Sequence, residues 1–192
     1  MKVGDVLLTQ DVEEALAALK QGRKVLFSPK MSYLKGLEGK FLPVFWSPVH
    51  FPRQAGTMGL LCNTQHAALR HFPTEMHSNW QWWNLVKRSK VLVVDSLPLE
   101  PIVESIDNFT NNRKLVSVFE TKCGKGKLIM SAMDILSEGS DKPEIQQMLY
   151  SLVTYMNSES FAPRTMLGEE DIRSLILKNE GKVIETKATS IY

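Results

Sequence analysis

The spacing of apolar and polar positions predicts strands and helices along most of the chain. Residues 5–9 and 24–28 are short apolar runs of the length of buried strands. Between them, apolar residues recur every three or four positions, as on one face of a helix. Asp11 can cap the start of this helix and Gly22 can stop it. A buried strand, a helix and a second buried strand predict a parallel sheet.

The middle of the chain lacks this regularity. Across residues 31–72 prolines and glycines interrupt the pattern, and the expected elements are short. They are strands at residues 41–46 and 57–62, and one or two helical turns at residues 64–70. Irregular segments of this length in a compact domain are often functional or bind a partner.

Regular structure resumes in the second half of the chain. Residues 79–87 predict a short helix rich in tryptophan, and residues 90–95 and 101–106 predict strands. Residues 113–122 and 127–133 are two further apolar runs, separated by a short turn with two glycines. This arrangement predicts a β-hairpin.

The clearest helix follows the hairpin. Asp141 is in position to cap it and Pro143 lies in its first turn. Its apolar stripe consists of Ile145, Met148, Leu149, Leu152, Val153 and Met156. A last helix is predicted at residues 169–178. Together the elements predict an α/β domain at residues 1–160, with a mostly parallel sheet flanked by helices and a C-terminal hairpin. Residues 161–192 are expected to form a C-terminal helix and a loose tail.

Composition and charge argue against several classes of protein. The 192 residues suit one domain, and 43% hydrophobic and 23% charged residues are typical of a globular protein with a core. The net charge is +2 and the basic residues are scattered, so no nucleic acid is expected as a partner. No apolar run approaches the roughly 20 residues of a membrane span, so no membrane is expected either. Cys62 and Cys123 adjoin apolar runs and are interpreted as small core residues.

The sequence does not identify a catalytic or metal site. Cys62 and His66 could act as nucleophile and base, but small residues do not flank Cys62 as they do at a strained nucleophile turn. The four histidines, between residues 50 and 77, lack metal-site spacing. Asp95 and Asp134 each follow an apolar run, where an acid usually caps the next turn. The sequence therefore predicts no cofactor, no metal and no catalytic residue.

The most unusual stretch is residues 72–83, where three of the four tryptophans fall within four positions. Indole rings stack on the apolar faces of sugars, while amides and acids bind sugar hydroxyls. The candidate ligand-binding or interface residues are Glu75, His77, Asn79, Trp80, Trp82 and Trp83. In the alternative interpretation, Trp80 and Trp83, one helical turn apart, fill the core while Trp82 meets a partner domain. Core or interface packing is favoured over sugar contact, and both remain open.

Several stretches of the sequence carry a family resemblance. They are residues 45–52 (FWSPVHFP), 56–59 (GTMG), 72–83 (FPTEMHSNWQWW), 106–115 and 124–128. Over residues 5–160 the chain resembles the C-terminal region of large family 2 glycoside hydrolases from gut Bacteroidetes. Those proteins are often described as β-galactosidases or sugar-binding-domain proteins.

The resemblance implies an accessory domain of a glycosidase. The catalytic glutamates of such enzymes lie on an α/β barrel of about 250 residues, longer than this chain. The implied fold is similar to that of class I glutamine amidotransferases, a flavodoxin-like type that also serves as a trimerisation domain in some β-galactosidases. The implied partners are the catalytic barrel of the same parent chain, an oligosaccharide and further copies of the chain. The implied location is the periplasm or outer surface of a Gram-negative bacterium.

Three functions follow as hypotheses. The leading one is a non-catalytic domain of a carbohydrate-degrading glycosidase, used for inter-domain packing, oligomerisation or sugar contact. The second is a stand-alone carbohydrate-binding module built on the segment from Trp80 to Trp83. The third is a divergent amidotransferase-like hydrolase that uses Cys62 with His66 or His77.

Overall fold

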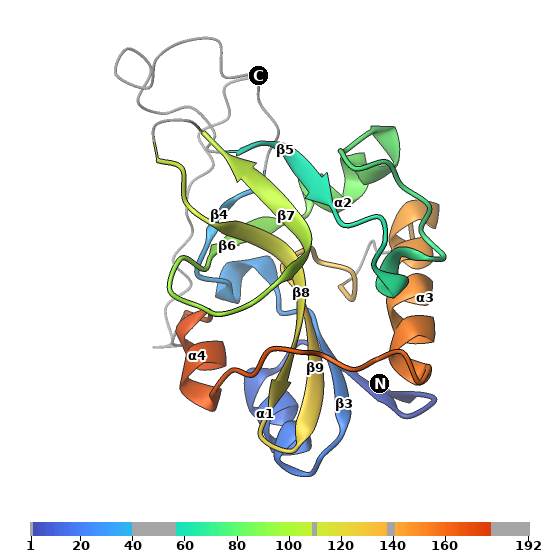
Figure 1. Ribbon diagram of the computed structural model, residues 1–192, viewed down its shortest axis with the longest axis vertical. Helices are drawn as coiled ribbons and strands as arrows, with labels where there is room; N and C mark the ends of the chain where they lie inside the picture. The colour runs from blue at the N-terminus through green and yellow to red at the C-terminus, as the bar shows by residue number, and fades with distance from the viewer. Residues whose placement is uncertain (1, 40–56, 109–110, 138–140, 178–192) are drawn as a thin grey trace.

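The computed structural model describes residues 2–39, 57–108, 111–137 and 141–177. In this part of the chain nine strands form one sheet, with helices on both of its faces (Figure 1). The chain is therefore an α/β protein, as the apolar pattern predicts. The strand predicted at residues 41–46, the resemblance stretch at residues 45–52 and the tail from residue 179 lie outside the described residues.

The first part of the sheet is parallel. The predicted strand, helix and strand are present, and the second strand pairs in parallel with a third from the hairpin. The Asp11 side chain accepts a hydrogen bond from the Glu14 amide at 2.9 Å, which confirms the predicted cap. The elements are β1 (Lys2–Val3), antiparallel at the edge, then β2 (Val6–Thr9), α1 (Val12–Lys20), β3 (Lys24–Phe27) and β9 (Gly126–Ser131).

The predicted hairpin joins β9 to the rest of the sheet. Strand β8 (Leu115–Cys123) pairs antiparallel with β9 along most of its length. The turn between them requires glycine at two positions. Gly124 has a φ of +59°, and a Cβ on Gly126 would lie 2.6 Å from the carbonyl oxygen of Arg23. The hairpin therefore packs directly against the end of α1 and the start of β3.

The remaining strands are antiparallel, so the prediction of a mostly parallel sheet is wrong. Strand β8 also pairs with β7 on its other edge and, near its start, with β6, and β7 pairs with β5. Among these strands, only β7 and β8 are neighbours joined by a short connection, as antiparallel strands can be, whereas the other antiparallel pairs bring together strands that are far apart in the chain. Apolar runs reveal buried strands but not their direction. The strands are β4 (Leu37–Glu38), β5 (Thr57–Cys62), β6 (Lys90–Val93) and β7 (Pro101–Asp107).

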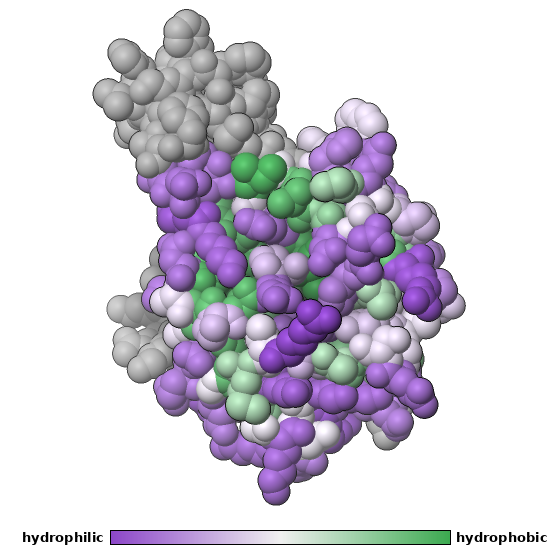
Figure 2. All heavy atoms as spheres, viewed as in Figure 1, coloured by the Kyte–Doolittle hydropathy of each residue, from purple (hydrophilic) through white to green (hydrophobic). Residues whose placement is uncertain are grey.

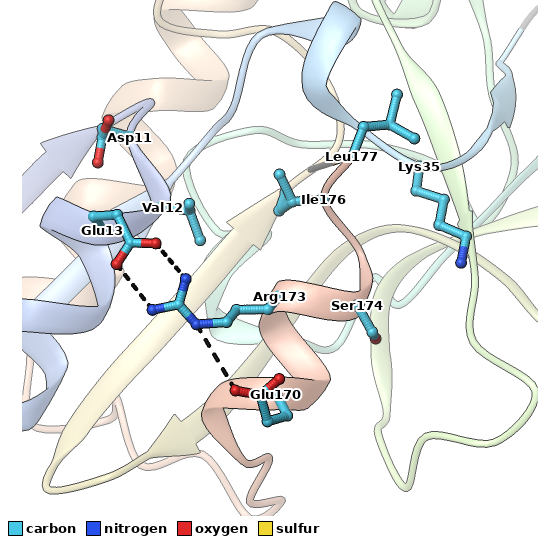
Figure 3. Close-up of a pocket in the computed structure, with 9 residues that line it drawn as sticks. All are labelled: Asp11, Val12, Glu13, Lys35, Glu170, Arg173, Ser174, Ile176 and Leu177. Carbon is cyan, nitrogen blue, oxygen red and sulfur yellow. Dashed lines mark hydrogen bonds and ion pairs between the residues drawn. The ribbon is translucent and has the colours of Figure 1, made fainter. Parts of the chain in front are cut away.

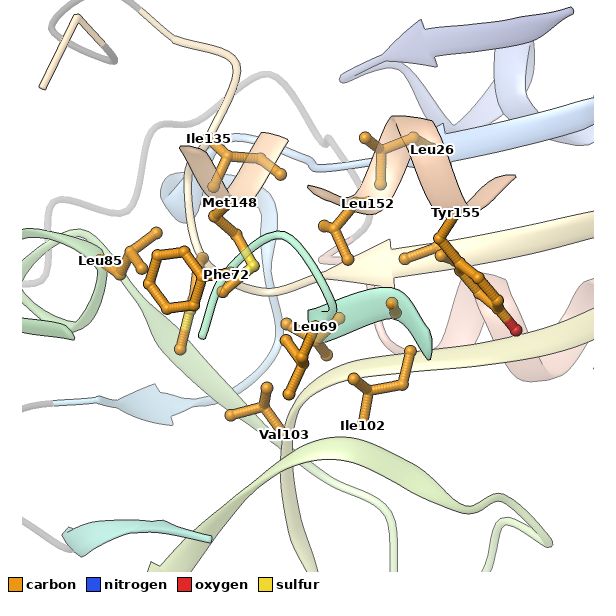
Figure 4. Close-up of a cluster of buried hydrophobic side chains, with 14 of the residues drawn as sticks. Leu26, Leu69, Phe72, Leu85, Ile102, Val103, Ile135, Met148, Leu152 and Tyr155 are labelled. Atoms are coloured by element: carbon orange, nitrogen blue, oxygen red, sulfur yellow. The ribbon is translucent and has the colours of Figure 1, made fainter. Parts of the chain in front are cut away.

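Each face of the sheet has its own core. On one face, α3 (Pro143–Asn157) covers the first core together with short helices (Figure 4). On the other, α1 and α4 (Glu169–Ser174) cover the second. Alternate residues of β9 point into the two cores, Ile129 into the first and Met130 into the second. The short helices are η1 (Met31–Tyr33), η2 (Ala67–Leu69), η3 (Trp80–Trp82) and α2 (Trp83–Lys87).

Helix α3 begins where the sequence predicts but is capped differently. Pro143 is its first residue, and Lys142, not Asp141, stands at the N-cap without a side-chain hydrogen bond. Proline suits this first position because its missing N–H would have no partner in the helix. The predicted apolar stripe faces the core, with Leu152 and Met156 fully buried. Among the described residues, no helix is long and apolar enough to cross a membrane.

The stretch after α3 packs on the same sheet. The amide of Lys122 on β8 donates to the Thr165 carbonyl oxygen at 2.9 Å, and the Leu167 amide donates back to Lys122 at 3.0 Å. Phe161 is buried in the first core, and Ile172 is buried in the second. Residues 161–177 therefore contribute to both cores. Helix α4 ends at Ser174, before the predicted end at residue 178.

Candidate functional site

The tryptophan segment contains one buried indole, that of Trp82. This side chain is 0% exposed and belongs to the core that α3 covers. Its ring lies edge-on to Phe72 with centroids 5.0 Å apart, and its Nε1 donates to the Thr74 hydroxyl at 2.8 Å. The indole ring therefore packs against apolar neighbours, and its polar nitrogen has a hydrogen-bond acceptor. The structure therefore corrects the interpretation that Trp82 contacts a ligand or partner.

Trp80 and Trp83 form an exposed aromatic pair, called the indole pair below. They are 83% and 51% exposed, with ring centroids 5.8 Å apart and planes inclined by 56°. The prediction that they share a face is confirmed, but this face is turned to solvent and not to the core. Residue spacing relates the two side chains to each other, because a 3₁₀ turn repeats every three residues. It does not say which side of the turn is buried.

Polar side chains border the indole pair. A shallow pocket of about 280 Å³ is lined by Ser78, Asn79 and the two indoles. The Asn79 side chain accepts from the Gln81 amide at 3.2 Å, which caps η3, and donates to Glu75 at 3.4 Å. The same Glu75 carboxylate lies 3.4 Å from His77 Nε2. Glu75, His77 and Asn79 thus form an exposed polar row beside the indole pair.

Exposed apolar side chains also lie on the neighbouring strands. Leu61 on β5 and Ile106 on β7 are each 43% exposed, and Met76 is 64% exposed. The Met76 carbonyl oxygen accepts from the Cys62 amide at 2.7 Å, so the segment runs along the edge of β5. Figure 2 shows hydrophobic side chains reaching the surface over β5 and β7. Exposed apolar surface bordered by polar groups is typical of a contact site.

Cys62 is placed as a core residue. It is 2% exposed, and its side chain belongs to the core under α3. Burial raises the pKa of the Cys62 thiol to about 11, although a hydrogen bond with Thr74 opposes the shift. The thiolate is the reactive form, and it is scarce at neutral pH when the pKa is this high. This environment argues against the hypothesis of a cysteine-dependent hydrolase.

We expect Cys62 to resist thiol reagents in the folded protein. Cys123 is also buried, and burial raises the pKa of its thiol as well. Native protein treated with a chromogenic disulfide reagent at pH 7.5 should therefore release little colour until denaturant exposes both thiols. Rapid native labelling that disappears in Cys62→Ser would contradict the buried assignment.

A separate polar pocket lies between η2, β8 and the end of α3. It encloses about 400 Å³, and we call it the Glu120 pocket. The Tyr155 hydroxyl donates to Glu120 Oε2 at 2.7 Å. Burial, followed by the adjacent Glu120 carboxylate, raises the pKa of Tyr155 well above its usual range, so the phenol keeps its proton. His66 Nε2 lies 3.8 Å from Glu120 Oε1, and the imidazole stands edge-on to the Tyr155 ring.

One residue of this pocket has a signal in the sequence. Glu120 is a carboxylate within β8 that directly follows the apolar pair Val118 and Phe119. Its partners His66 and Tyr155 lie on η2 and α3, far away in sequence, and only the fold brings them together. His66 was considered as a base for Cys62. Instead its Nδ1 accepts from the Ala68 amide at 3.2 Å and its other nitrogen faces Glu120.

A larger pocket of about 750 Å³ lies between the start of α1 and α4 (Figure 3). Charged residues line it, and three of them, Glu13, Glu170 and Arg173, interact with each other. Arg173 on α4 makes two hydrogen bonds to the Glu13 carboxylate on α1, one of them 2.8 Å long. Its Nε also lies 4.0 Å from Glu170. These contacts join the two helices that cover the second core.

The aspartates proposed as turn caps have structural roles. Asp134 accepts from the Ser137 amide at 3.0 Å, which confirms a cap, and lies 3.4 Å from Arg88. Asp95 instead accepts from the Lys114 amide at 2.6 Å and so connects the end of β6 to the start of β8. Within the described residues, no group of three or more histidines, cysteines, aspartates or glutamates is arranged to hold a metal ion.

The fold and these surfaces define an α/β domain with a mixed sheet, an exposed aromatic pair and a polar pocket. Residues 7–177 match the family model of a domain of unknown function, DUF8487. The chain belongs to this family. The matched range includes all of the second core, all of the first core except Val6, the indole pair and the Glu120 pocket. No curated protein matches the chain in sequence.

Proposed function

We propose that this chain is a non-catalytic contact domain of a carbohydrate-degrading glycoside hydrolase, with the indole pair at the centre of the contact. The exposure of Trp80 and Trp83 carries the proposal. Fully burying one large apolar side chain stabilises an association by about 1.5–3 kcal/mol. Tryptophans at the centre of an interface also dominate binding energies more often than other residues.

The partner in this proposal is the catalytic barrel of the same parent chain, or further copies of the domain. The family resemblance over residues 5–160 supports the barrel. Exposed Leu61, Met76 and Ile106 support a large contact, because they add apolar surface to that of the two indoles. An amidotransferase-like fold is part of the same proposal. It is supported by the parallel strands β2, β3 and β9 with helices on both faces, while the antiparallel strands depart from it.

Sugar binding is a second candidate function. It is favoured by the polar row of Glu75, His77 and Asn79, which borders the indole pair. In this mode a sugar ring stacks on an indole while carboxylate and amide groups bind its hydroxyls.

Two comparisons test these functions. Turnover assays on the unmodified domain test for catalysis, and the double variant Trp80→Ala/Trp83→Ala tests whether binding depends on the indole pair. The unmodified domain is expected to give no turnover of chromogenic galactosides. Calorimetry with plant oligosaccharides at millimolar concentration tests the sugar mode, and sedimentation tests self-association. Loss of either signal in the double variant, by about tenfold or more, assigns it to the indole pair.

Tyr150→Ala is the matched control, because Tyr150 is an exposed aromatic on α3 outside the tryptophan segment. Tyr150→Ala should leave both the sugar-binding signal and the self-association signal unchanged.

For contact with a catalytic barrel, the surrounding reading frame is expected to encode an upstream barrel. Galactoside turnover by clean domain would reject a non-catalytic role. The absence of an upstream barrel, of sugar heat and of self-association would together reject the contact function.

A further inference from the structure

The Glu120 pocket carries chemistry that the contact function does not use. None of the indole residues lines it. Its walls come from the loop after β5, the start of β7, the middle of β8, the end of α3 and the segment that follows α3. Small-molecule sites are usually concave and built from several segments with a few convergent polar groups. Its volume of about 400 Å³ suits a ligand the size of an amino acid.

One oxygen of the Glu120 carboxylate accepts a short side-chain hydrogen bond, and the other oxygen does not. Its side chain is 13% exposed. Oε2 accepts from Tyr155 at 2.7 Å, whereas Oε1 faces His66 Nε2 at 3.8 Å, beyond hydrogen-bond distance. His66 Nδ1 accepts from the Ala68 amide at 3.2 Å, so Nε2 is the ring nitrogen that faces Glu120. A largely buried carboxylate with an oxygen that accepts no side-chain hydrogen bond is best stabilised by a cationic hydrogen-bond donor.

Two charged side chains of opposite sign also line the pocket. They are Glu100 and Arg164, both exposed. Neither forms an ion pair or hydrogen bond with another side chain in the part of the chain that the structure describes. Arginine binds carboxylates through two parallel hydrogen bonds, and free carboxylates bind ammonium groups. The pocket therefore presents acceptors for a cation and a donor for an anion.

We propose that the Glu120 pocket binds a small zwitterion, a free amino acid. The ammonium group lies against Glu120 Oε1, with Glu100 adding negative charge, and the carboxylate binds Arg164. The Tyr155 hydroxyl orients Glu120 by its hydrogen bond and stays protonated.

Three probes with the same four-carbon tail test the proposal by calorimetry and ligand-observed NMR. n-Butylammonium carries only the cation, 1-butanol is neutral, and L-norleucine carries both charges. We expect norleucine to bind most tightly, and butylammonium to bind at least about tenfold more tightly than butanol. Glu120→Gln should weaken both ammonium probes about tenfold or more, because it keeps the shape and removes the charge. Arg164→Gln should reduce the affinity for norleucine to that for butylammonium.

Circular dichroism checks that each variant folds. If Glu120→Gln does not fold, Glu100→Gln replaces it as the test of ammonium binding, because Glu100 is exposed. Equal binding of butanol and butylammonium overturns the proposal, as does ammonium binding unchanged in Glu120→Gln. Tighter binding of butylammonium than norleucine would indicate a lysine side chain of a partner protein, and rejects the amino acid. Binding of D-galactose in place of the ammonium probes rejects it as well. None of these results depends on the indole pair, so the two proposals fail independently.

Discussion

Trp82→Ala is expected to destabilise the protein by about 3–5 kcal/mol. The substitution removes the largest fully buried side chain among the described residues. It leaves a cavity beside Phe72 and deprives the Thr74 hydroxyl of the indole donor at 2.8 Å. Both losses act in the same direction, because the core relaxes only partly around a cavity. Urea unfolding followed by circular dichroism measures the change in free energy.

Trp80→Ala is the matched control for this prediction. It deletes the same side chain two residues away in the same short helix, at a position that is 83% exposed. Surface substitutions of this kind usually change stability by about 0.5 kcal/mol or less. Similar costs for the two variants would contradict the assignment of Trp82 to the core and Trp80 to the surface.

Asp107→Ala is expected to cost about 3 kcal/mol, at the lower end of values for breaking a buried ion pair. The Asp107 side chain is 2% exposed at the end of β7. It accepts hydrogen bonds from Arg113 Nε at 2.8 Å and from the Arg113 and Asn108 amides at 2.9 and 2.8 Å. The substitution leaves these donors without their acceptor. Arg113 is 29% exposed and can turn towards water, which limits the cost.

The Asp107 contribution is expected to disappear in acid. Burial alone would raise the pKa of Asp107, but the hydrogen bonds from Arg113 and Asn108 outweigh it and lower the pKa below its usual value. The stabilisation is therefore complete above the unfolded pKa of about 3.9, and is lost as the pH falls through the folded pKa. Unfolding curves of wild type and Asp107→Asn should differ at pH 7 and converge below about pH 4. A difference that grows in acid would contradict this sign.

Local signals in the sequence predicted much of the fold. The cap at Asp11, the parallel β2–α1–β3 unit and the β8–β9 hairpin each depend on residues close together in the chain, and all three are present. Strand direction in the rest of the sheet was wrong, because it depends on which distant strands pair. The same limit applies to side chains. The spacing of Trp80 and Trp83 predicted a shared face, but only the packed core decides that Trp82 is the buried one.

The Glu120 pocket shows the same limit for a functional site. Its residues share no motif, since Tyr155 reaches Glu120 across 35 positions from a different element. Glu120 follows an apolar run within β8, but no residue near it in the sequence identifies its partners. The indole pair was easier to find, because aromatic residues that act together also lie together in the sequence.

The pairing of β3 with β9 has a consequence for how the chain folds during synthesis. Val25 is opposite Leu128, so about 100 residues must be made after β3 before its second edge can be covered. At ribosomal rates of 5–20 residues per second this takes roughly 5–20 seconds. Throughout that time the nascent β2–α1–β3 unit exposes the backbone edge of an apolar strand, the kind of edge that pairs with other chains. Chaperone demand and inclusion-body formation should therefore depend on how quickly the ribosome reaches the hairpin.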